Sequence, residues 1–374
     1  MRVLAWRNLV HDKVRLLVTL TGIVFAVVLI VVELGLFLGF TTATSSLIDH
    51  SRADLWITAP RVPYIEQAVP FSERKVATVL ATPGVARAAK YVVRFTQWKR
   101  PDGRQESVQI VGVDLASGLG TPWNVVAGTL DDLRKPDAVF VDEIYREKLG
   151  VAHIGQVVEI RGRRARIAGF TRGIRAFTTS PYVFTTFKNA LDYADLRDDQ
   201  TLYILVKAAA GADSGALRHA LAARLRDVDV VTNAGFSRMT QVYWMFTTGA
   251  GIAVLLAALL GLVVGIVVVA QTIYATTVDH LREYGTLKAM GATNRYLYGV
   301  IVLQAVISAV IGYAVGMIVS VFVVRGSEQG GAAILLPPAM AAGMLVLTLV
   351  MCVGAAIVSI NKVTRLDPAM VFKG

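Results

Sequence analysis

Cysteine is nearly absent from this chain of 374 residues, and the one cysteine, Cys352, lies within an apolar run near the C-terminal end. Residues 41–248 therefore have no disulfide and no cysteine-based metal site. A histidine-based zinc or catalytic site needs at least three convergent ligands, and the histidines are too scattered to predict one. They are His11, His50, His153, His219 and His280.

Motifs for nucleotide hydrolysis and proteolysis are also missing. The dipeptide Gly-Lys occurs nowhere, which excludes the glycine-rich phosphate loop of an ATPase. Neither H-E-x-x-H nor G-x-S-x-G is present. The acidic pairs Asp131–Asp132 and Asp198–Asp199 have the surroundings of solvated turns. We therefore predict no catalytic residue, no metal site and no cofactor bound by this chain.

A basic block is missing too. Lysine and arginine number 38 against 27 acidic residues, so the formal net charge is +11. The excess is spread over the flanks of apolar runs and over a region of mixed charge. Nucleic acid is therefore not an expected partner.

Apolar sequence is what the chain has in abundance. It is 55% hydrophobic with a mean hydropathy of +0.56, more apolar than soluble globular proteins. A bilayer core of about 30 Å needs roughly 20 helical residues. Long apolar runs predict an α-helical integral membrane protein with four transmembrane helices, at 16–40, 249–275, 296–324 and 339–360. The first run is too long for a signal peptide, and no small-residue cleavage site follows it.

Lysine and arginine at the span ends predict the orientation. They gather before the first span, between the second and third, and after the fourth, whereas the short loop 325–338 has only Arg325. We therefore expect the tail at 361–374, the N-terminus and the second loop in the cytoplasm, and 41–248 outside. Residues 1–15, with Trp6 on an apolar stripe, predict a helix lying in the membrane interface. The alternative is a simple extension of the first span.

Residues 41–248 mix short β-branched runs with amphipathic helices, which predicts a large α+β extracytoplasmic domain between the first and second transmembrane helices. Helices are expected at 72–85 and 214–227, with Ser72 as a weak N-cap and Asp213 or Ser214 as a better one. Two β-branched runs predict a hairpin across Arg163 and Arg164. The loop-rich portion at about 116–198 predicts an inserted lobe.

Small and ionisable residues stand out within the spans. Gly261 with Gly265, and Gly312 with Gly316, have the G-x-x-x-G spacing that lets helices approach closely in lipid. Glu33, inside the first run, is a candidate intramembrane polar site. It lies about 26 Å along the helix from Leu16. The alternative is therefore a carboxylate at the level of the outer headgroups.

The stretch DHLREYGTLKAMGAT, at 279–293, is a dense polar segment between two apolar runs. Asp279 is a candidate N-cap and Gly291 a candidate end for a short helix. Its spacing places Tyr284 on one side and Glu283 on the other. Such a helix can pass force from a docked protein to both spans, and an ordinary amphipathic loop is the alternative.

This stretch resembles the signature of FtsX-like, MacB-type ABC transporter permeases. In that family an Arg-Glu pair, a Gly two positions later and an Ala-x-Gly-Ala ending follow the second span. The matching residues are Arg282, Glu283, Gly285, Ala289, Gly291 and Ala292. The C-terminal VTRLDPAMVFKG is similar to the family's ending, and residues 4–36 are similar to the DevC-like branch. The resemblance covers the whole chain, without the fused ATPase domain of full-length MacB.

The resemblance implies the permease subunit of an ABC transporter in the inner membrane of a bacterium. ATP and Mg are then bound by a separate ATPase subunit, present in two copies, and the permease pairs with a second copy as a homodimer. ATP-driven closure is relayed through the spans to the outer domains, a mechanotransmission that need not move substrate through the membrane core. The residues expected to couple to the ATPase are Arg282, Glu283, Tyr284, Gly285, Leu287, Lys288, Met290, Gly291, Arg365, Asp367 and Pro368.

The DevC-like branch further implies efflux with a periplasmic adaptor (membrane-fusion) protein and an outer-membrane channel. Membrane lipid is a further partner, and the expected cargo is a lipid, a peptide or a drug-like molecule. Two other functions stay open. A regulatory permease would transport nothing and activate a cell-wall hydrolase through its outer domain, and it shares these motifs. A membrane-anchored enzyme would need a catalytic constellation, which the sequence lacks.

Overall fold

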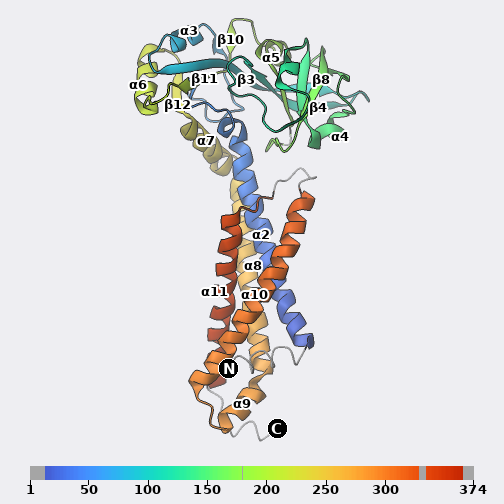
Figure 1. Cartoon of the computed structure of the whole chain (residues 1–374), viewed down its shortest axis with the longest axis vertical. Helices are drawn as coiled ribbons and strands as arrows, with labels where there is room; N and C mark the ends of the chain where they lie inside the picture. Colours follow the sequence, from blue (N-terminus) through green and yellow to red (C-terminus); the bar gives the residue numbers. More distant parts are fainter. Residues whose placement is uncertain (1–12, 179, 328–333, 365–374) are drawn as a thin grey trace. The chain divides into compact units, whose positions relative to one another are not determined.

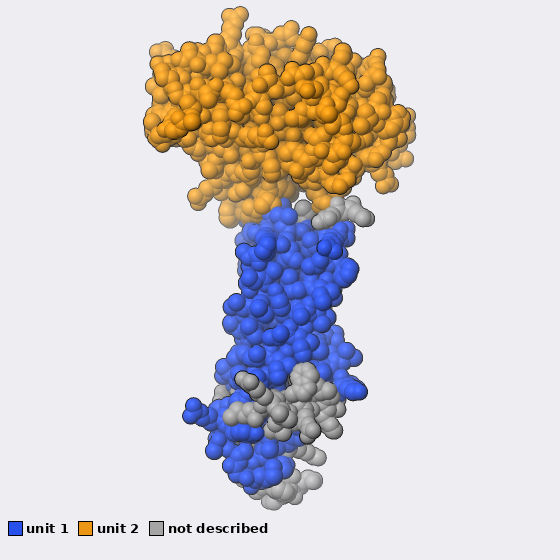
Figure 2. Space-filling view, in the orientation of Figure 1, with its two compact units in different colours: residues 1–39, 252–328, 332–374 blue, residues 40–251, 329–331 orange. Residues whose placement is uncertain are grey.

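The computed structural model describes residues 13–178, 180–327 and 334–364. The chain divides into two compact units (Figure 2). The membrane unit comprises residues 1–39, 252–328 and 332–374, and the outer unit comprises residues 40–251 and 329–331.

Long helices make up the membrane unit (Figure 1). They are α2 (Lys13–Asp49), α8 (Ala250–Asp279), α10 (Asn294–Ser327) and α11 (Pro338–Thr364). In the described part of the chain, these four are long and apolar enough to cross a membrane, which confirms the predicted architecture. The interfacial helix expected at 1–15 falls mostly outside the described residues, and its last three residues belong to α2.

Apolar side chains from all four helices form the core of the membrane unit. Ile23 and Ile30 of α2 belong to one buried cluster with Val269 of α8, Ile301 of α10 and Cys352 of α11. The polar segment between α8 and α10 forms a shorter helix, α9 (Leu281–Ala289).

The outer unit is built on a sheet in which ten strands pair within the described residues. They are β1 (Leu55–Thr58), β3 (Val85–Lys99), β4 (Gln105–Val113), β5 (Val125–Ala127), β6 (Ala138–Asp142), β7 (Val157–Ile160), β8 (Arg163–Thr171), β9 (Tyr182–Thr186), β11 (Tyr203–Ala208) and β12 (Asp229–Thr232). The order is β12-β1-β11-β3-β4-β9-β6-β8-β5, with β7 against β3 and β8. A separate pair joins β2 (Phe71–Ser72) to β10 (Gln200–Thr201).

Helices and single turns cover this sheet (Figure 1). The helices are α3 (Lys75–Leu80), α4 (Arg146–Leu149), α5 (Phe187–Ala194), α6 (Ser214–Arg224) and α7 (Asn233–Val242). The turns are the 3₁₀ segments η1 (Leu130–Arg134) and η2 (Glu143–Tyr145) and the π-helical segment η3 (Tyr243–Thr247).

Strand β3 joins the two halves of the sheet. Its first half, up to Tyr91, pairs with β11, and its second half, from Val92, pairs with β4. The portion at 116–198 contains β5 to β9 and lies on the β4 side of β3. The periodicity did not predict β3, because the sequence ARAAK at its start mixes small and charged residues.

Two local predictions need correction. β7 and β8 do form a hairpin, but the turn is Arg161–Gly162, whose φ angles are +50° and +74°. Such a two-residue turn needs positive φ at both positions, so Arg163 and Arg164 begin β8. Ser72 belongs to β2 and does not cap α3, whereas the Asp213 carboxylate caps α6 by accepting from Ala216 N at 2.7 Å.

Candidate functional site

The polar stretch at 279–293 begins as a bend between two helices. α8 continues through Asp279, His280 occupies the N-cap position, and α9 follows directly. The prediction that Asp279 caps the helix is therefore wrong. The prediction that Gly291 ends it is confirmed, because Gly291 has a φ of +93° and Ala292 N donates to Leu287 O at 3.0 Å.

One face of α9 is buried in the membrane unit. His280, Tyr284 and Leu287, spaced four and three residues apart, turn towards the core. Tyr284 is 1% exposed, and its hydroxyl donates to Oε1 of Gln304 on α10 at 2.9 Å. Burial raises the pKa of this phenol. Tyr284 therefore anchors α9 to α10, and its expected role in coupling to the ATPase stays a prediction.

The opposite face of α9 is exposed. Glu283, Thr286 and Ala289 recur at helical spacing, and Met290 at the C-cap is 71% exposed. Glu283 Oε2 lies 3.0 Å from Nδ1 of His280, a distance at which an ion pair forms when the imidazole is protonated. The geometry is not that of a hydrogen bond, since Nδ1 has no such partner among the described residues. This face combines charge with an exposed apolar tip.

For the other residues expected to couple to an ATPase, the structure gives fewer contacts or none. Gly285 is buried and Lys288 is half-buried. Arg282 lies in α9, but its side chain is not among those described. Three further residues lie outside the described part: Arg365, Asp367 and Pro368.

The first glycine pair packs α8 against α2. A Cβ added at Gly261 would lie 2.8 Å from Cγ of Glu33, and one added at Gly265 would lie 2.7 Å from Cδ1 of Ile30. Real Cβ atoms essentially never come within 3.0 Å of another atom, so a larger residue at either position would have to displace Glu33 or Ile30. Glu33 is half-buried against α8. Its role as an intramembrane polar site stays a prediction.

The second glycine pair packs α10 against the same helix. A Cβ added at Gly312 would lie 2.5 Å from Cγ2 of Ile23, and one added at Gly316 would lie 2.9 Å from Cβ of Val27. Both glycine pairs therefore pack helices of the same chain against each other, and α8 and α10 both lie close to α2.

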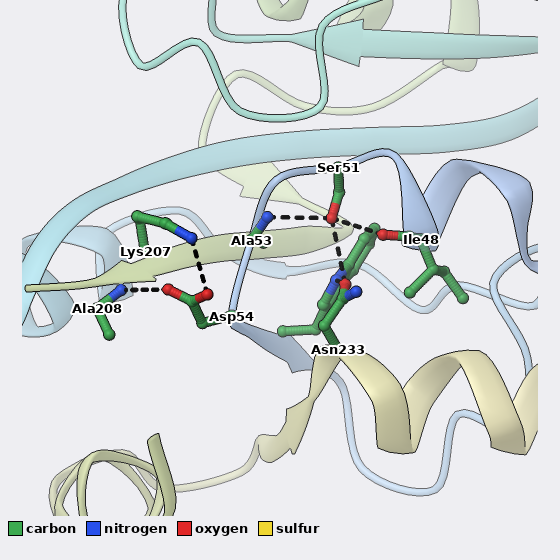
Figure 3. A network of polar contacts seen from close by, with 8 residues as sticks. Ile48, Ser51, Ala53, Asp54, Lys207, Ala208 and Asn233 are labelled. Atoms are coloured by element: carbon green, nitrogen blue, oxygen red, sulfur yellow. Dashed lines mark hydrogen bonds and ion pairs between the residues drawn. The ribbon is translucent and has the colours of Figure 1, made fainter. Parts of the chain in front are cut away.

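A polar network in the outer unit joins the end of α2 to the start of α7 (Figure 3). The Ser51 hydroxyl donates to Ile48 O at 2.7 Å and lies 3.2 Å from Oδ1 of Asn233. Nε1 of the fully buried Trp56 also donates to that Oδ1, at 2.8 Å. One amide side chain thus connects α7, β1 and the turn that follows α2.

Asp54 extends this network to the sheet (Figure 3). Its carboxylate accepts from Nζ of Lys207 and from Ala208 N on β11, both at 2.8 Å. Its carbonyl accepts from Asn233 N at 2.9 Å. Asp54 therefore connects the turn after α2 to both α7 and β11.

A cluster of rings, here called the aromatic clasp, lies in the same unit and consists of Phe40, Tyr64, Phe177, Tyr243 and Trp244. Tyr64 stacks on Tyr243 with ring centres 4.0 Å apart, and it meets Trp244 edge-on at 5.4 Å. Phe177 lies 4.8 Å from Trp244 and 4.4 Å from Phe40. The clasp therefore links α2 to η3, which leads into α8.

Sequence reasoning missed the network and the clasp. Asn233, Tyr64 and Phe177 are far apart in the chain, so no local periodicity marks them. A usable signal was the pair Tyr243–Trp244 just before the second apolar run, because aromatic residues gather at membrane interfaces.

The acidic pairs have structural partners. Thr129 N and the Thr129 hydroxyl donate to Asp132, which also pairs with Lys135 at 2.6 Å. Asp199 lies 3.4 Å from the Arg197 guanidinium. Within the described ranges, no group of three or more His, Cys, Asp and Glu side chains is placed to hold a metal ion.

Comparisons with known proteins give two family matches. Residues 16–224 match the MacB-like periplasmic core domain, and residues 255–368 match the FtsX-like permease C-terminal domain. An uncharacterized ABC transporter permease of Mycobacterium tuberculosis is 24% identical over 384 residues, covering 99% of each chain. Another, of Mycobacterium bovis, is 22% identical over 374 residues with the same coverage.

Two solved structures are also similar. The periplasmic region of MacB from Actinobacillus actinomycetemcomitans is 13% identical and covers 50% of this chain and 92% of its own, with a TM-score of 0.38. The extracellular domain of the transporter YknZ from Gram-positive bacteria is 13% identical and covers 48% and 98%, with a TM-score of 0.35.

Proposed function

Because the chain belongs to the MacB and FtsX family of ABC transporter permeases, we propose that it couples ATP hydrolysis by a separate ATPase to movement of its outer unit and so drives export. Membership of this family implies an ATPase partner. The observation that carries the proposal is α9, a short helix with one face anchored and the other exposed. ATP and Mg are bound by the partner in this proposal, and the chain alone hydrolyses no ATP.

The anchored face makes α9 a suitable docking element. A helix of this length is marginal in water by itself, since isolated helices below about 12–15 residues rarely persist. Tyr284 holds it through burial and the bond to Gln304. The side chains of Glu283 and Met290 are exposed on the other face. Force applied to this face passes to α10 through Tyr284.

From α10, the force passes in this proposal through the helices that pack closely against one another. Gly312 and Gly316 set α10 directly on α2, which is one helix of 37 residues. Interiors packed this closely move as units because they resist compression. At its far end, α2 meets the Ser51–Asn233 network, which leads to β1 and β11. In this proposal the outer unit is the moving part that acts on cargo.

The wider assembly is part of the same proposal. Two permease copies, forming a homodimer, bind two ATPase subunits in a bacterial inner membrane, with both termini and α9 in the cytoplasm. A periplasmic adaptor and an outer-membrane channel receive a lipid, a peptide or a drug-like cargo by efflux. Activation of a cell-wall hydrolase remains the alternative, and no particular contact described above favours it.

Docking is tested by charge reversal on the exposed face. Glu283→Lys should weaken co-purification of the ATPase, because reversing a charge at a buried interface costs about 2–5 kcal/mol. That corresponds to roughly 30-fold or more in affinity. Met290→Asp should weaken co-purification too, because it would place an unpaired carboxylate in an apolar contact. Tyr284→Phe is the matched control, since its ring stays in the core and the exposed face is unchanged. If both variants retain the ATPase and its turnover like wild type, α9 is not the docking element.

Orientation is tested by thiol labelling in a Cys352→Ala background. A cysteine at the exposed Ala116 should react with an impermeant reagent added to intact cells, and a cysteine at the exposed Ala289 should not. The expectation comes from the lysine and arginine distribution. Labelling of position 289 from outside would reverse the assignment without affecting the family.

A further inference from the structure

The π-helical segment η3 is the unusual element in the outer unit. It spans Tyr243–Thr247, between α7 and α8. π-helical turns are rare and frequently mark functional positions, because the widened turn sacrifices regular hydrogen bonding. Phe246 on this segment is 60% exposed, and Val242, which ends α7 just before it, is 46% exposed. Tyr243 and Trp244 are therefore the side chains that hold η3 to the rest of the unit.

The surface against which η3 packs is a stiff loop at residues 59–70, which contains three prolines. Val62 and Ile65 are buried in the sheet's core, and the Tyr203 hydroxyl donates to Ile65 O at 2.7 Å. The loop is thereby fixed to the sheet. Tyr64 and Glu66 on either side of Ile65 are the residues that meet η3.

Glu66 makes a polar contact between this loop and η3. Its Oε2 accepts from Nε1 of Trp244 at 3.4 Å, at the long end of hydrogen-bond distances. Part of the Glu66 side chain is still exposed, but the aromatic rings around it exclude much of the solvent. Burial therefore dominates and raises the pKa of Glu66 to about 7, and the bonds from Trp244 and from its own amide offset only part of this shift.

The titratable groups facing Glu66 are phenols. Tyr64 comes from its own loop, Tyr182 from β9 and Tyr203 from β11, and the Glu66 charge contributes to raising the pKa of each. Tyr243 comes from η3 through its stack on Tyr64. The causes of the shift at Glu66 are its burial and the two hydrogen bonds that partly offset it.

An ionised Glu66 is therefore a carboxylate next to aromatic rings. Its hydrogen bond from Trp244 of η3 is long. Separation of η3 from the loop would admit water to that carboxylate, and water is a better partner than a single indole N–H.

We propose that Glu66 is the switch of a proton-controlled latch. With the carboxyl group neutral, η3 stays docked on the loop through the Tyr64–Tyr243 stack. With the carboxylate ionised, η3 separates from the loop and Trp244 meets solvent. The inference concerns the outer unit itself and does not depend on the proposed function.

Trp244 provides its own reporter in the full-length chain. Trp56 and Trp98 are fully buried, so replacing Trp6 and Trp123 with Phe leaves Trp244 as the tryptophan that an aqueous quencher can reach. Acrylamide quenching should rise several-fold between pH 5.5 and pH 8.5, with a midpoint near the value of about 7 for Glu66. Subtracting the spectrum of the Trp244→Phe variant isolates the signal.

Three substitutions test whether Glu66, and not another titrating group, causes the pH dependence of Trp244 quenching. Glu66→Gln keeps the acceptor for Trp244 without the charge, so its quenching should stay low at every pH. Glu147→Gln, at an exposed glutamate, and His50→Gln, at the histidine beside Trp123, should both keep the wild-type response. A wild type without pH dependence, or a Glu66→Gln variant that retains it, would overturn the proposal.

A variant on the other side of the contact guards against misfolding of Glu66→Gln. Tyr64→Leu keeps an apolar side chain but removes the stack, so Trp244 should be quenched strongly even at pH 5.5. Equal protection of Trp244 in Tyr64→Leu and wild type at pH 5.5 would show that the stack does not hold η3.

Discussion

The two units of this chain are packed internally in opposite ways. In the membrane unit, glycines let helices approach closely, with Gly265 against Ile30 and Gly312 against Ile23. In the outer unit the centre is occupied by the largest side chains. Trp56 lies 5.6 Å from Tyr91 and 5.4 Å from Tyr203, ring centre to ring centre, and all three are fully buried.

The difference follows from the solvent that each unit meets. In lipid there is no hydrophobic force between helices, so stability comes from close backbone approach, which small residues permit. In water the buried apolar area provides the driving force, at roughly 25 cal/mol per Å², and aromatic rings bury most area per residue. Removing a large side chain should therefore damage the outer unit, and adding one should damage the membrane unit.

The largest effect is expected for Trp56→Ala in the outer unit. Loss of a buried tryptophan costs about 3–5 kcal/mol of unfolding free energy, and here the bond to Asn233 is lost as well. Near-ultraviolet circular dichroism should show a lower melting temperature for the outer unit. Labelling of Cys352, buried in the membrane unit, should keep its wild-type rate. If both signals fall together, the two units do not respond separately.

A somewhat smaller effect is expected for Gly312→Leu in the membrane unit. The new side chain would overlap Ile23 from its first carbon onwards, and overpacking of this kind typically costs about 1–3 kcal/mol. Faster labelling of Cys352 on heating is the measurement. Gly343→Leu on α11 is the matched control, because no atom lies within 4 Å of the added Cβ there. Equal labelling rates in the two variants would argue against glycine packing.

A third variant tests the link between α9 and α10. Tyr284→Phe removes one hydrogen bond to Gln304 and leaves the ring in place, so the cost should be about 1 kcal/mol. Cys352 labelling during thermal unfolding should show a small decrease in stability, without loss of ATPase binding. A decrease as large as that of Gly312→Leu would mean that this bond carries more of the unit than its geometry suggests.

Local patterns made much of the membrane unit predictable. Apolar length marks the four spans, and helical spacing separates Tyr284 from Glu283 on α9. The cap at Asp279 was mispredicted because a helix can continue through a polar residue when tertiary contacts hold the next turn, and here that turn carries the buried Tyr284.

Contacts between distant residues were not predictable in the same way. Ser51 and Asn233 are separated by 182 positions, and Tyr64 meets Tyr243 only after the whole sheet has folded. Strand β3 escaped notice because its inward residues include alanines, which carry little β signal. The hairpin turn was predicted two residues too late, at Arg163–Arg164 and not at Arg161–Gly162. In this arginine-rich run, Gly162 is the one residue typical of a turn.

The smallest predicted effect is a pH response that occurs in the outer unit and not in the membrane unit. It concerns Asp132 on the surface of the outer unit. Hydrogen bonds from Lys135 and Thr129 lower the pKa of this carboxyl to about 2. A lowered pKa means that the ionised form stabilises the fold, so the contribution is present above the usual carboxyl pKa of about 4 and is lost as the pH falls towards 2. The η1 turn should therefore lose hydrogen-exchange protection at Thr129 N between pH 4 and pH 2, while Cys352 stays unreactive.

Asp132→Asn should remove this pH dependence, because an amide accepts from Thr129 but does not pair with Lys135. Asp131→Asn is the matched control, since that neighbour pairs with Arg134 at the surface and should leave the dependence intact. Expressing the result as a protection factor divides out the intrinsic effect of pH on exchange. If Asp131→Asn abolishes the response and Asp132→Asn does not, the acid sensitivity of this turn comes from the surface ion pair and not from the capped carboxylate.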